Sequence, residues 1–322
     1  MNRIIFFSKA PNLINSKTRL EKFLNENERL ELMRKLIKQN YNLVEDKNFS
    51  SIIYYDGDLS NIAFLEGQKT PQSGNDLGEK MKNAIYNELD IYSKVALFGS
   101  DLENLSKNHI EEAFKKLDNF DIVIAPSKDG GYGLVAMKEK IDIFTNIKYS
   151  TPFVLEDTIK QINKLKKTYY LLDPIRDIDT ISDLIIAEFD NDNVTELGHG
   201  EYNLNYRLNN EVIRINLASQ IGLGEKQLKY EYDALKVLEK LGVTPKPYKF
   251  YGKGKFLPKS FMTMEYVEGR PLNYKSDMDI AAKLLSSVHN LRGEYDNFIC
   301  AKKPFQFMFD EFVSMFSYCL LY

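Results

Sequence analysis

The apolar residues of the first 190 positions follow two spacings. Short, mainly apolar runs predict buried strands, and they lie at 4–7, 51–55, 95–98, 121–125 and 134–137. Longer segments with apolar residues every three or four positions predict helices, and they lie at about 27–37, 77–89, 109–117 and 181–187. Because the strands alternate with the helices, we expect an α/β domain whose mostly parallel sheet is covered by helices.

A change of composition follows this domain. The polar run 190–193 favours a first domain at 1–190, a linker at 191–196 and a second domain at 197–322. The second domain begins with a strand, a glycine loop and another strand, and then continues with a strand at 212–215, a helix around 231–235 and a strand at 261–267. This order predicts an α+β domain.

Composition narrows the possible functions. The chain has 322 residues, 43% of them hydrophobic, and a formal net charge of -3. Such a chain can bury the cores of two domains and presents no basic field for nucleic acid. Apolar runs stay well short of the roughly 18 residues that a membrane span needs. We therefore expect a cytoplasmic, soluble protein with no nucleic-acid partner and no membrane span.

A glycine-rich loop separates the last two strand-like runs of the first domain. The segment 128–134 contains Asp129, Gly130 and Gly131. Glycines beside a carboxylate at a strand end suggest a loop that admits a ligand, because glycine offers no side chain for packing. A tight turn between two strands explains the same residues equally well, so both interpretations stay open.

Two cations follow the first predicted strand. Lys17 and Arg19 lie one residue apart in or beside a loop that begins at Lys9. The planar donor fork of arginine and the point charge of lysine together suit the neutralisation of phosphate oxygens. The alternative is a basic loop in water. Parallel sheets bind ligands at the carboxyl ends of their strands, and this loop lies there.

Carboxylates follow two other predicted elements. Asp101 ends the strand at 95–98, where it could bind Mg²⁺ or Mn²⁺ or simply cap a turn. Asp177 and Asp179 precede the helix at 181–187 together with Thr180. For this second group a helix cap is the favoured interpretation, because Asp and Thr are both common at helix starts.

Several motifs together carry a resemblance to a known family. They are Lys9-Ala10-Pro11 with Lys17-Thr18-Arg19-Leu20, Gln72-Ser73-Gly74-Asn75-Asp76-Leu77-Gly78, Phe98-Gly99-Ser100-Asp101, 126–134, Tyr149-Ser150-Thr151 and Asp177-Ile178-Asp179-Thr180. In this order they resemble the GT-A-type, glycosyltransferase-like family related to 2-phospho-lactate guanylyltransferase, over about residues 1–190.

The resemblance implies a Rossmann-like GT-A nucleotide-diphospho-sugar transferase fold that uses Mg²⁺ or Mn²⁺. Lys17 and Arg19 match the phosphate-binding loop of the family, and Asp101 matches the acid of its metal site. Two positions depart from the family pattern. Residues 12–15 replace a usual Pro-Gly, and Glu103 replaces a proline that commonly follows the acid.

The second domain resembles the amino-terminal lobe of aminoglycoside phosphotransferases and choline kinase-like enzymes. The resemblance implies a nucleotide loop at Gly198 and Gly200, a phosphate-binding Arg214, its helix partner Glu231 and an adenine hinge at 264–266. Kinases of this kind need a His-x-Asp catalytic loop, which follows none of the three histidines. We therefore expect an incomplete lobe that does not transfer phosphate by itself.

The leading hypothesis is a metal-dependent nucleotidylyltransferase that moves a nucleotide from an NTP to a small phosphorylated acceptor. Lys17 and Arg19 would neutralise phosphates, while the metal would lie on Asp101 with Asp129 or Asp179. A glycosyltransferase that uses a nucleotide-sugar is the first alternative, and a non-catalytic nucleotide-binding scaffold is the second. Expected partners are the nucleotide, the acceptor and either a missing kinase carboxyl-terminal lobe or a second copy of the chain.

Overall fold

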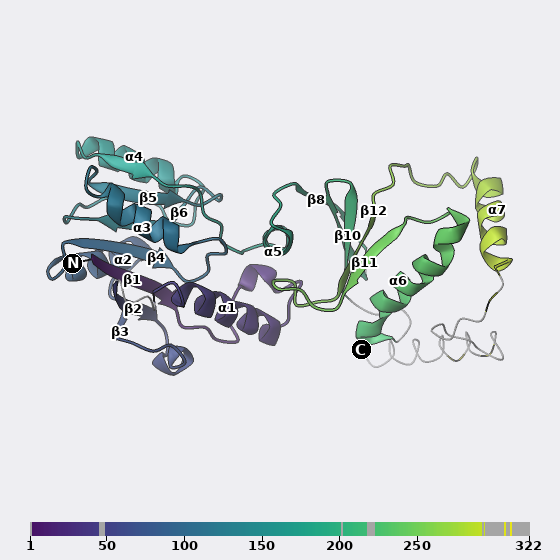
Figure 1. Ribbon diagram of the computed structural model, residues 1–322, viewed down its shortest axis with the longest axis horizontal. Coiled ribbons are helices and arrows are strands. Elements are labelled where there is room, and N and C mark those ends of the chain that lie inside the picture. Colours follow the sequence, from purple (N-terminus) through teal and green to yellow (C-terminus); the bar gives the residue numbers. More distant parts are fainter. Residues whose placement is uncertain are drawn as a thin grey trace. The chain divides into compact units, whose positions relative to one another are not determined.

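The computed structural model describes residues 2–44, 49–200, 202–217, 223–291, 293, 306 and 310. It forms two compact units (Figure 1). The first unit comprises Met1–Asp192 and Lys255–Pro258, and the second comprises Asn193–Gly254 and Lys259–Tyr322. Nearly all of the predicted kinase-like segment after residue 293 lies outside the described residues.

The first unit is built on one sheet. Its strands are β1 (Asn2–Lys9), β2 (Ser50–Asp56), β3 (Lys69–Pro71), β4 (Lys94–Gly99), β5 (Ile122–Pro126), β6 (Tyr132–Met137) and β7 (Tyr169–Leu171). Its α-helices are α1 (Glu26–Tyr41), α2 (Leu77–Leu89), α3 (Lys107–Lys116), α4 (Val154–Lys164) and α5 (Ile181–Phe189). The strand order is β3-β2-β1-β4-β6-β5-β7.

The sheet is mostly parallel, as the alternation of strands and helices predicts. Strand β1 runs parallel to β2 and β4, and β5 runs parallel to β7. Strand β6 is antiparallel to both of its neighbours, β4 and β5. The connection 127–131 explains this exception, because it is far too short to carry a chain across the sheet and can only close a hairpin.

Helices cover both faces of this sheet and so bury its apolar residues (Figure 1). On one face, α1 and α3 pack against alternate residues of β1 and β4, including Phe6 and Phe98. On the other face, α2 and α4 pack against the intervening residues of the same two strands, including Ile5 and Leu97. Successive strand residues point to opposite faces, and both faces are apolar, which explains the uninterrupted apolar runs of the sequence.

Helix α1 begins at a capping box. The side chain of Asn25 accepts a hydrogen bond from the backbone N–H of Glu28 at 3.0 Å, and the Glu28 carboxylate accepts one from the N–H of Asn25 at 2.9 Å. The helix therefore starts slightly before the apolar pattern predicts. Its buried face contains Met33, Leu36 and Ile37, and also the charged residue Arg29.

The second unit contains an antiparallel sheet in the order β11-β12-β10-β9-β8. Its elements are β8 (Val194–His199), β9 (Asn203–Leu208), β10 (Glu211–Asn216), α6 (Gln227–Leu238), β11 (Pro247–Tyr251), β12 (Phe261–Glu265) and α7 (Met278–His289). Helix α6 packs on β10, β11 and β12. Because β8 begins at Val194, it starts inside the segment 191–196 for which the sequence predicts a linker.

Throughout the described part of the chain, every helix is too short or too polar to cross a membrane.

Candidate active site at the carboxyl end of the sheet

Two adjoining cavities open where the strands of the first unit end. One has a volume of about 600 Å³ and the other about 550 Å³. Both are lined by Lys9, Arg19, Asp56, Asp101 and Asp179. Lys9 ends β1 and Asp56 ends β2, so the cavities lie at the edge where parallel sheets bind their ligands.

The loop after β1 is folded by its own side chains. The Asn12 side-chain oxygen accepts hydrogen bonds from the backbone N–H groups of Ile14 and Asn15, at 3.0 and 2.8 Å. The Ser16 hydroxyl accepts another from the N–H of Asn12 at 3.1 Å. An Asn that bonds to the backbone two residues on makes a turn without glycine, which explains how residues 12–15 replace the Pro-Gly of the family pattern.

Lys17 lies between two carboxylates. Its Nζ is 3.0 Å from Oδ2 of Asp101 and 3.4 Å from Oδ1 of Asp179, and its side chain is only 4% exposed. Burial alone would lower the pKa of this ammonium, but Asp101 and Asp179 outweigh burial and raise it. The backbone of Lys17 is left-handed, with φ 46°, which directs the side chain inward at a local conformational cost.

The two acids come from separate elements. Asp101 follows β4, and Lys17 lowers the pKa of its carboxyl against the opposing effect of burial. Asp179 also forms an ion pair with Arg19, whose side chain is mostly exposed. The structure thus brings together four residues that the sequence singles out: Lys17, Arg19, Asp101 and Asp179.

The cap of α5 falls on Thr180 rather than on Asp179. The Thr180 hydroxyl accepts from the backbone N–H of Asp183 at 3.2 Å, and the Asp183 carboxylate accepts from the N–H of Thr180 at 2.6 Å. This arrangement is a capping box. Capping therefore leaves the carboxylate of Asp179 facing Lys17 and Arg19.

Asp177 adds negative charge that no described basic residue neutralises by an ion pair. Burial first, and then repulsion from Asp179, Asp129 and Asp101, raise the pKa of its carboxyl to about 6. The sequence prediction names Asp177 in a motif without giving it a role in the site. Two of the three acids that repel it, Asp129 and Asp101, lie more than 40 positions away along the chain, so no local pattern reveals the whole cluster.

The departure at Glu103 has a structural explanation. Glu103 accepts hydrogen bonds from Nε and Nη2 of Arg176, at 3.2 and 2.9 Å, and both side chains are largely buried. The N–H of Glu103 also donates to the carbonyl of Arg176 at 2.7 Å. This pair joins the segment that carries Asp177 to the segment that carries Asp101.

The glycine-rich loop closes the hairpin between β5 and β6 and also lines the larger cavity. The carboxylate of Asp129 accepts from the backbone N–H of Gly131 at 3.1 Å and from the hydroxyl of Ser127. Gly130 has φ +88°, and a Cβ there would lie 2.1 Å from the carbonyl oxygen of Pro152. Gly131 lines the cavity. The tight turn is therefore present and Gly130 serves its packing, while the admission of a ligand by this loop stays a prediction.

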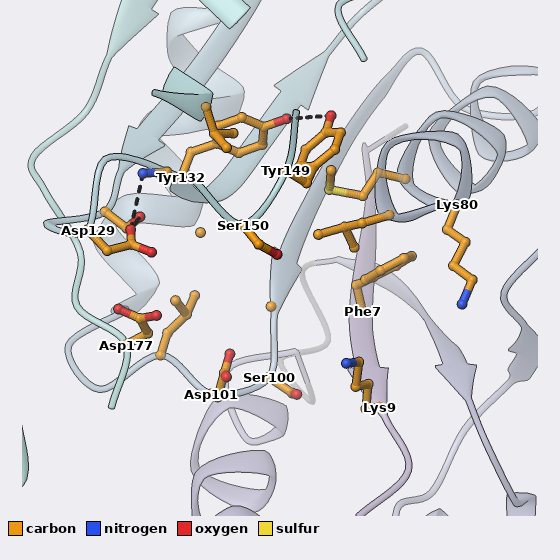
Figure 2. A pocket seen from close by; sticks show the side chains of 18 of the residues that line it. Phe7, Lys9, Lys80, Ser100, Asp101, Asp129, Tyr132, Tyr149, Ser150 and Asp177 are labelled. Atoms are coloured by element: carbon orange, nitrogen blue, oxygen red, sulfur yellow. Dashed lines mark hydrogen bonds between the residues drawn. The ribbon is translucent and has the colours of Figure 1, made fainter. Parts of the chain in front are cut away.

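Figure 2 shows how charge is divided around the larger cavity. Asp101, Asp129 and Asp177 lie on one side, and Lys9 and Lys80 lie on the other. The apolar and aromatic side chains that line the same cavity include Phe7, Met81, Leu97, Tyr132 and Tyr149. A ligand with a polar end and a flat apolar part would match this division.

The residues of this edge fit a divalent cation. The single ammonium nitrogen of Lys17 reaches oxygens of both Asp101 and Asp179, so a positive charge can be shared by these two acids. Among the described residues, no group of three Asp, Glu, His or Cys side chains is close enough to hold a metal ion. Two carboxylates suffice for Mg²⁺, which takes its other ligands from water and substrate phosphates.

The second unit pairs the two residues that the sequence singles out. Nη2 of Arg214 on β10 lies 2.7 Å from Oε1 of Glu231 on α6, and Nη1 donates to the side-chain oxygen of Asn205 at 3.2 Å. Gly198 has φ +141° and open space around its Cα, while the N–H of Gly200 donates to the carbonyl of Asn203 at 2.9 Å.

Comparison with known proteins places similarity in the first half of the chain. Residues 42–151 match the model of a family described as DUF2064, an uncharacterized protein conserved in bacteria. The 2-phospho-L-lactate guanylyltransferase of Methanocaldococcus jannaschii is 29% identical over 178 residues, which cover 53% of this chain and 76% of that enzyme. The same enzyme of Methanocaldococcus infernus is 28% identical over 188 residues, or 57% of this chain and 82% of the relative.

A solved structure has the same fold. It belongs to a protein of Desulfovibrio desulfuricans G20 described as a nucleotide-diphospho-sugar transferase. The TM-score is 0.56 at 28% sequence identity, and the match covers 60% of this chain and 88% of that protein. The amino-terminal part of the chain therefore has a nucleotide-diphospho-sugar transferase-like fold.

Proposed function

We propose that the first unit is a metal-dependent nucleotidylyltransferase that transfers a nucleotide from an NTP to a small phosphorylated acceptor. One observation carries the proposal: the cations of the loop after β1 meet two acids from other elements, Asp101 and Asp179, at one cavity wall. The similarity to guanylyltransferases supports it. In such ion pairs, the cations can neutralise the oxygens of a polyphosphate, and the acids can hold the divalent cation that accompanies it.

The chemistry is a substitution at phosphorus. A phosphate oxygen of the acceptor forms a bond to the α-phosphorus, the bond to the bridging oxygen breaks, and pyrophosphate leaves with that electron pair. Negative charge develops on the leaving oxygens, and fixed positive groups stabilise it most where water is excluded. Lys17 and Arg19 supply these groups, with Lys9 at the same cavity wall.

Mg²⁺ or Mn²⁺ would be held by Asp101 and Asp179 and would add positive charge next to the phosphates. Lys17 holds the pKa of Asp101 below its usual range, which favours the ionised form of this acid. The carboxylate of Asp129 accepts a hydrogen bond from the backbone of its own turn. We therefore propose that Asp129 positions this loop beside the acceptor and does not contact the metal.

A glycosyltransferase that uses a nucleotide-sugar is the second candidate, because the Desulfovibrio protein of similar fold carries that description. The same cations and acids would then hold the diphosphate of the donor, and the sugar would be transferred instead. The products distinguish the two reactions, since one releases pyrophosphate and the other a nucleoside diphosphate.

The test supplies each of the four common NTPs with Mg²⁺ and a panel of small phosphorylated acceptors, and measures pyrophosphate. A parallel series supplies nucleotide-sugars and measures nucleoside diphosphate. Metal-dependent pyrophosphate release would support the nucleotidylyltransferase. Nucleoside diphosphate from a nucleotide-sugar alone would replace it with the glycosyltransferase, and binding without turnover in either series would favour a scaffold.

For the second unit we infer an incomplete kinase-like lobe. The ion pair between Arg214 and Glu231 supports this, because kinases place a basic strand residue against a helix glutamate to hold phosphates. We expect ATP binding without phosphoryl transfer by this chain alone. Transfer of phosphate from ATP to a small alcohol, abolished by Arg214→Ala, would overturn that inference.

A further inference from the structure

Arg29 is a buried cation that the proposed reaction scheme leaves unused. It lies in the first two turns of α1, and only 5% of its surface is exposed. Its Nη1 donates to the carbonyl of Ser16 at a long 3.4 Å, and its Nε has no hydrogen-bond partner. No carboxylate among the described residues forms an ion pair with it.

Such a charge is costly in the unliganded protein. Arginine does not lose its proton in proteins, so the positive charge persists inside the structure. Buried charges are normally paired, because an uncompensated one loses its hydration without gaining a partner. Among the described residues, the guanidinium of Arg29 therefore has one long hydrogen bond and no counter-charge.

The place of Arg29 indicates where that counter-charge binds. Within the described part of the chain, the side chain of Arg29 donates one hydrogen bond, to Ser16, which directly precedes Lys17 in the loop after β1. Ser16 and Lys17 line the 550 Å³ cavity together with Lys9 and Arg19. Arg29 thus lies beneath the loop that presents the cations of the site, and its charge acts in the same direction as theirs.

We propose that Arg29 is a positioning residue for a polyphosphate bound at this loop. It orients the loop through the carbonyl of Ser16, and the bound anion supplies the counter-charge that the unliganded protein lacks. This inference rests on the proposed function for the identity of the anion, a nucleotide polyphosphate. It does not rest on the reaction that follows binding.

The test uses the full chain and two probes, inorganic tripolyphosphate and an NTP, each with Mg²⁺. Arg29→Met keeps the aliphatic length and removes the charge, whereas Arg29→Lys keeps the charge. Arg34→Met is the matched control, since Arg34 is an exposed arginine on the same helix. The measurements are the Kd of each probe and the unfolding of the unliganded protein in denaturant.

We expect Arg29→Met to weaken tripolyphosphate binding about ten-fold, the loss of roughly one charge-assisted interaction, with stability unchanged or higher without ligand. Arg29→Lys should recover part of the affinity, and Arg34→Met should change neither quantity. A less stable Arg29→Met variant with an unchanged Kd would overturn the inference, as would a wild-type chain that binds no tripolyphosphate. If tripolyphosphate binding depends on Arg29 but no nucleotide is turned over, the proposed function is refuted and the inference about Arg29 stands.

Discussion

The two ends of the sheet in the first unit differ in how their charged side chains are paired. At the amino end, Nε of Arg3 lies 2.8 Å from Oε2 of Glu88, and both side chains are 7% exposed. Arg3 also donates to Ser50 and Gln68, and the other oxygen of Glu88 accepts from Tyr54. At the carboxyl end, Asp177 and Arg29 carry charge that no residue described in the structure balances by an ion pair.

This difference distinguishes an ion pair that stabilises the fold from a cluster of charges that binds a ligand. A buried pair whose remaining donors and acceptors are satisfied holds the fold together, and breaking it is costly. A cluster with excess charge is a cost in the unliganded protein that a ligand can remove. Variants at the amino end should therefore lose stability, while variants at the carboxyl end should lose function.

The largest effect is expected from Asp101→Asn. Removing this charge should lower kcat/KM for nucleotide transfer about a thousand-fold, because in the proposed function this acid would hold the divalent cation that stabilises the phosphates. Its free energy of unfolding should fall much less than the activity, because Asp179 remains as a partner of the buried Lys17. Asp90→Asn, which removes an exposed acid paired with Lys140, is the control in steady-state assays. A variant with near wild-type activity would show that Asp101 has no part in the reaction.

Glu88→Gln should produce the next largest effect, and it should be structural. The substitution leaves Arg3 charged and buried without its partner, which we expect to cost about 3 kcal/mol of unfolding free energy. Activity per folded molecule should be preserved. Denaturant unfolding and activity at a permissive temperature measure both quantities. A stable but inactive variant would contradict the claim that the amino end of the sheet serves stability and the carboxyl end serves function.

Asp177→Asn should make the protein more stable near neutral pH. The folded carboxyl has a pKa of about 6, above the ordinary 3.8, so between about pH 4 and 6 the folded state binds more protons than the unfolded state. Stability then falls as pH rises through this window. The variant should exceed the wild type by about 2 kcal/mol at pH 7.5 and converge with it towards pH 4.

Urea unfolding from pH 4 to 8 in the presence of a chelator measures this difference. Asp173→Asn, an exposed acid nearby in the sequence, controls for net charge. Parallel pH profiles for wild type and Asp177→Asn would show that Asp177 carries no excess charge in the folded state.

Thr180→Ala should have the smallest effect. It removes the cap that starts α5 beside Asp179, and such caps contribute about 1 kcal/mol. Thr180→Ser should restore stability, since serine caps equally well. We expect activity to change less than stability, measured by thermal unfolding and initial rates. If activity fell while stability held, Thr180 would belong to the site itself.

Several elements of the first unit could be predicted from sequence because they repeat a local pattern. The bounds of α2 at Leu77–Leu89 were predicted correctly, since its apolar spacing is regular and Asp76 caps its start. Strands β3 and β7, three residues each, were missed because such short edge strands contain too few residues to show alternation. Strand β11 is also absent from the prediction, because it begins with a proline and its Tyr248 and Lys249 are exposed, so it shows no apolar alternation.

The sequence predicts which residues make up much of the site, but it does not predict which of its charges are buried and unpaired. Lys17, Arg19, Asp101 and Asp179 follow from motifs near strand and helix ends. Arg29 could not be found in this way, because a helical pattern assigns charged residues to the solvent face. Leu30 lies three positions before Met33 and seven before Ile37, a spacing that assigns it to the apolar face of the helix, but it is only partly buried, whereas the neighbouring Arg29 is buried.

One measurement tests most directly whether the unbalanced charge of the carboxyl end is a nucleotide site. It is the free energy of unfolding of the full chain with and without an NTP and Mg²⁺, for wild type and Asp101→Asn. We expect the wild type to gain about 2.7 kcal/mol at an NTP concentration one hundred times Kd, and Asp101→Asn to gain clearly less. Equal stability with and without every NTP and nucleotide-sugar would contradict this interpretation.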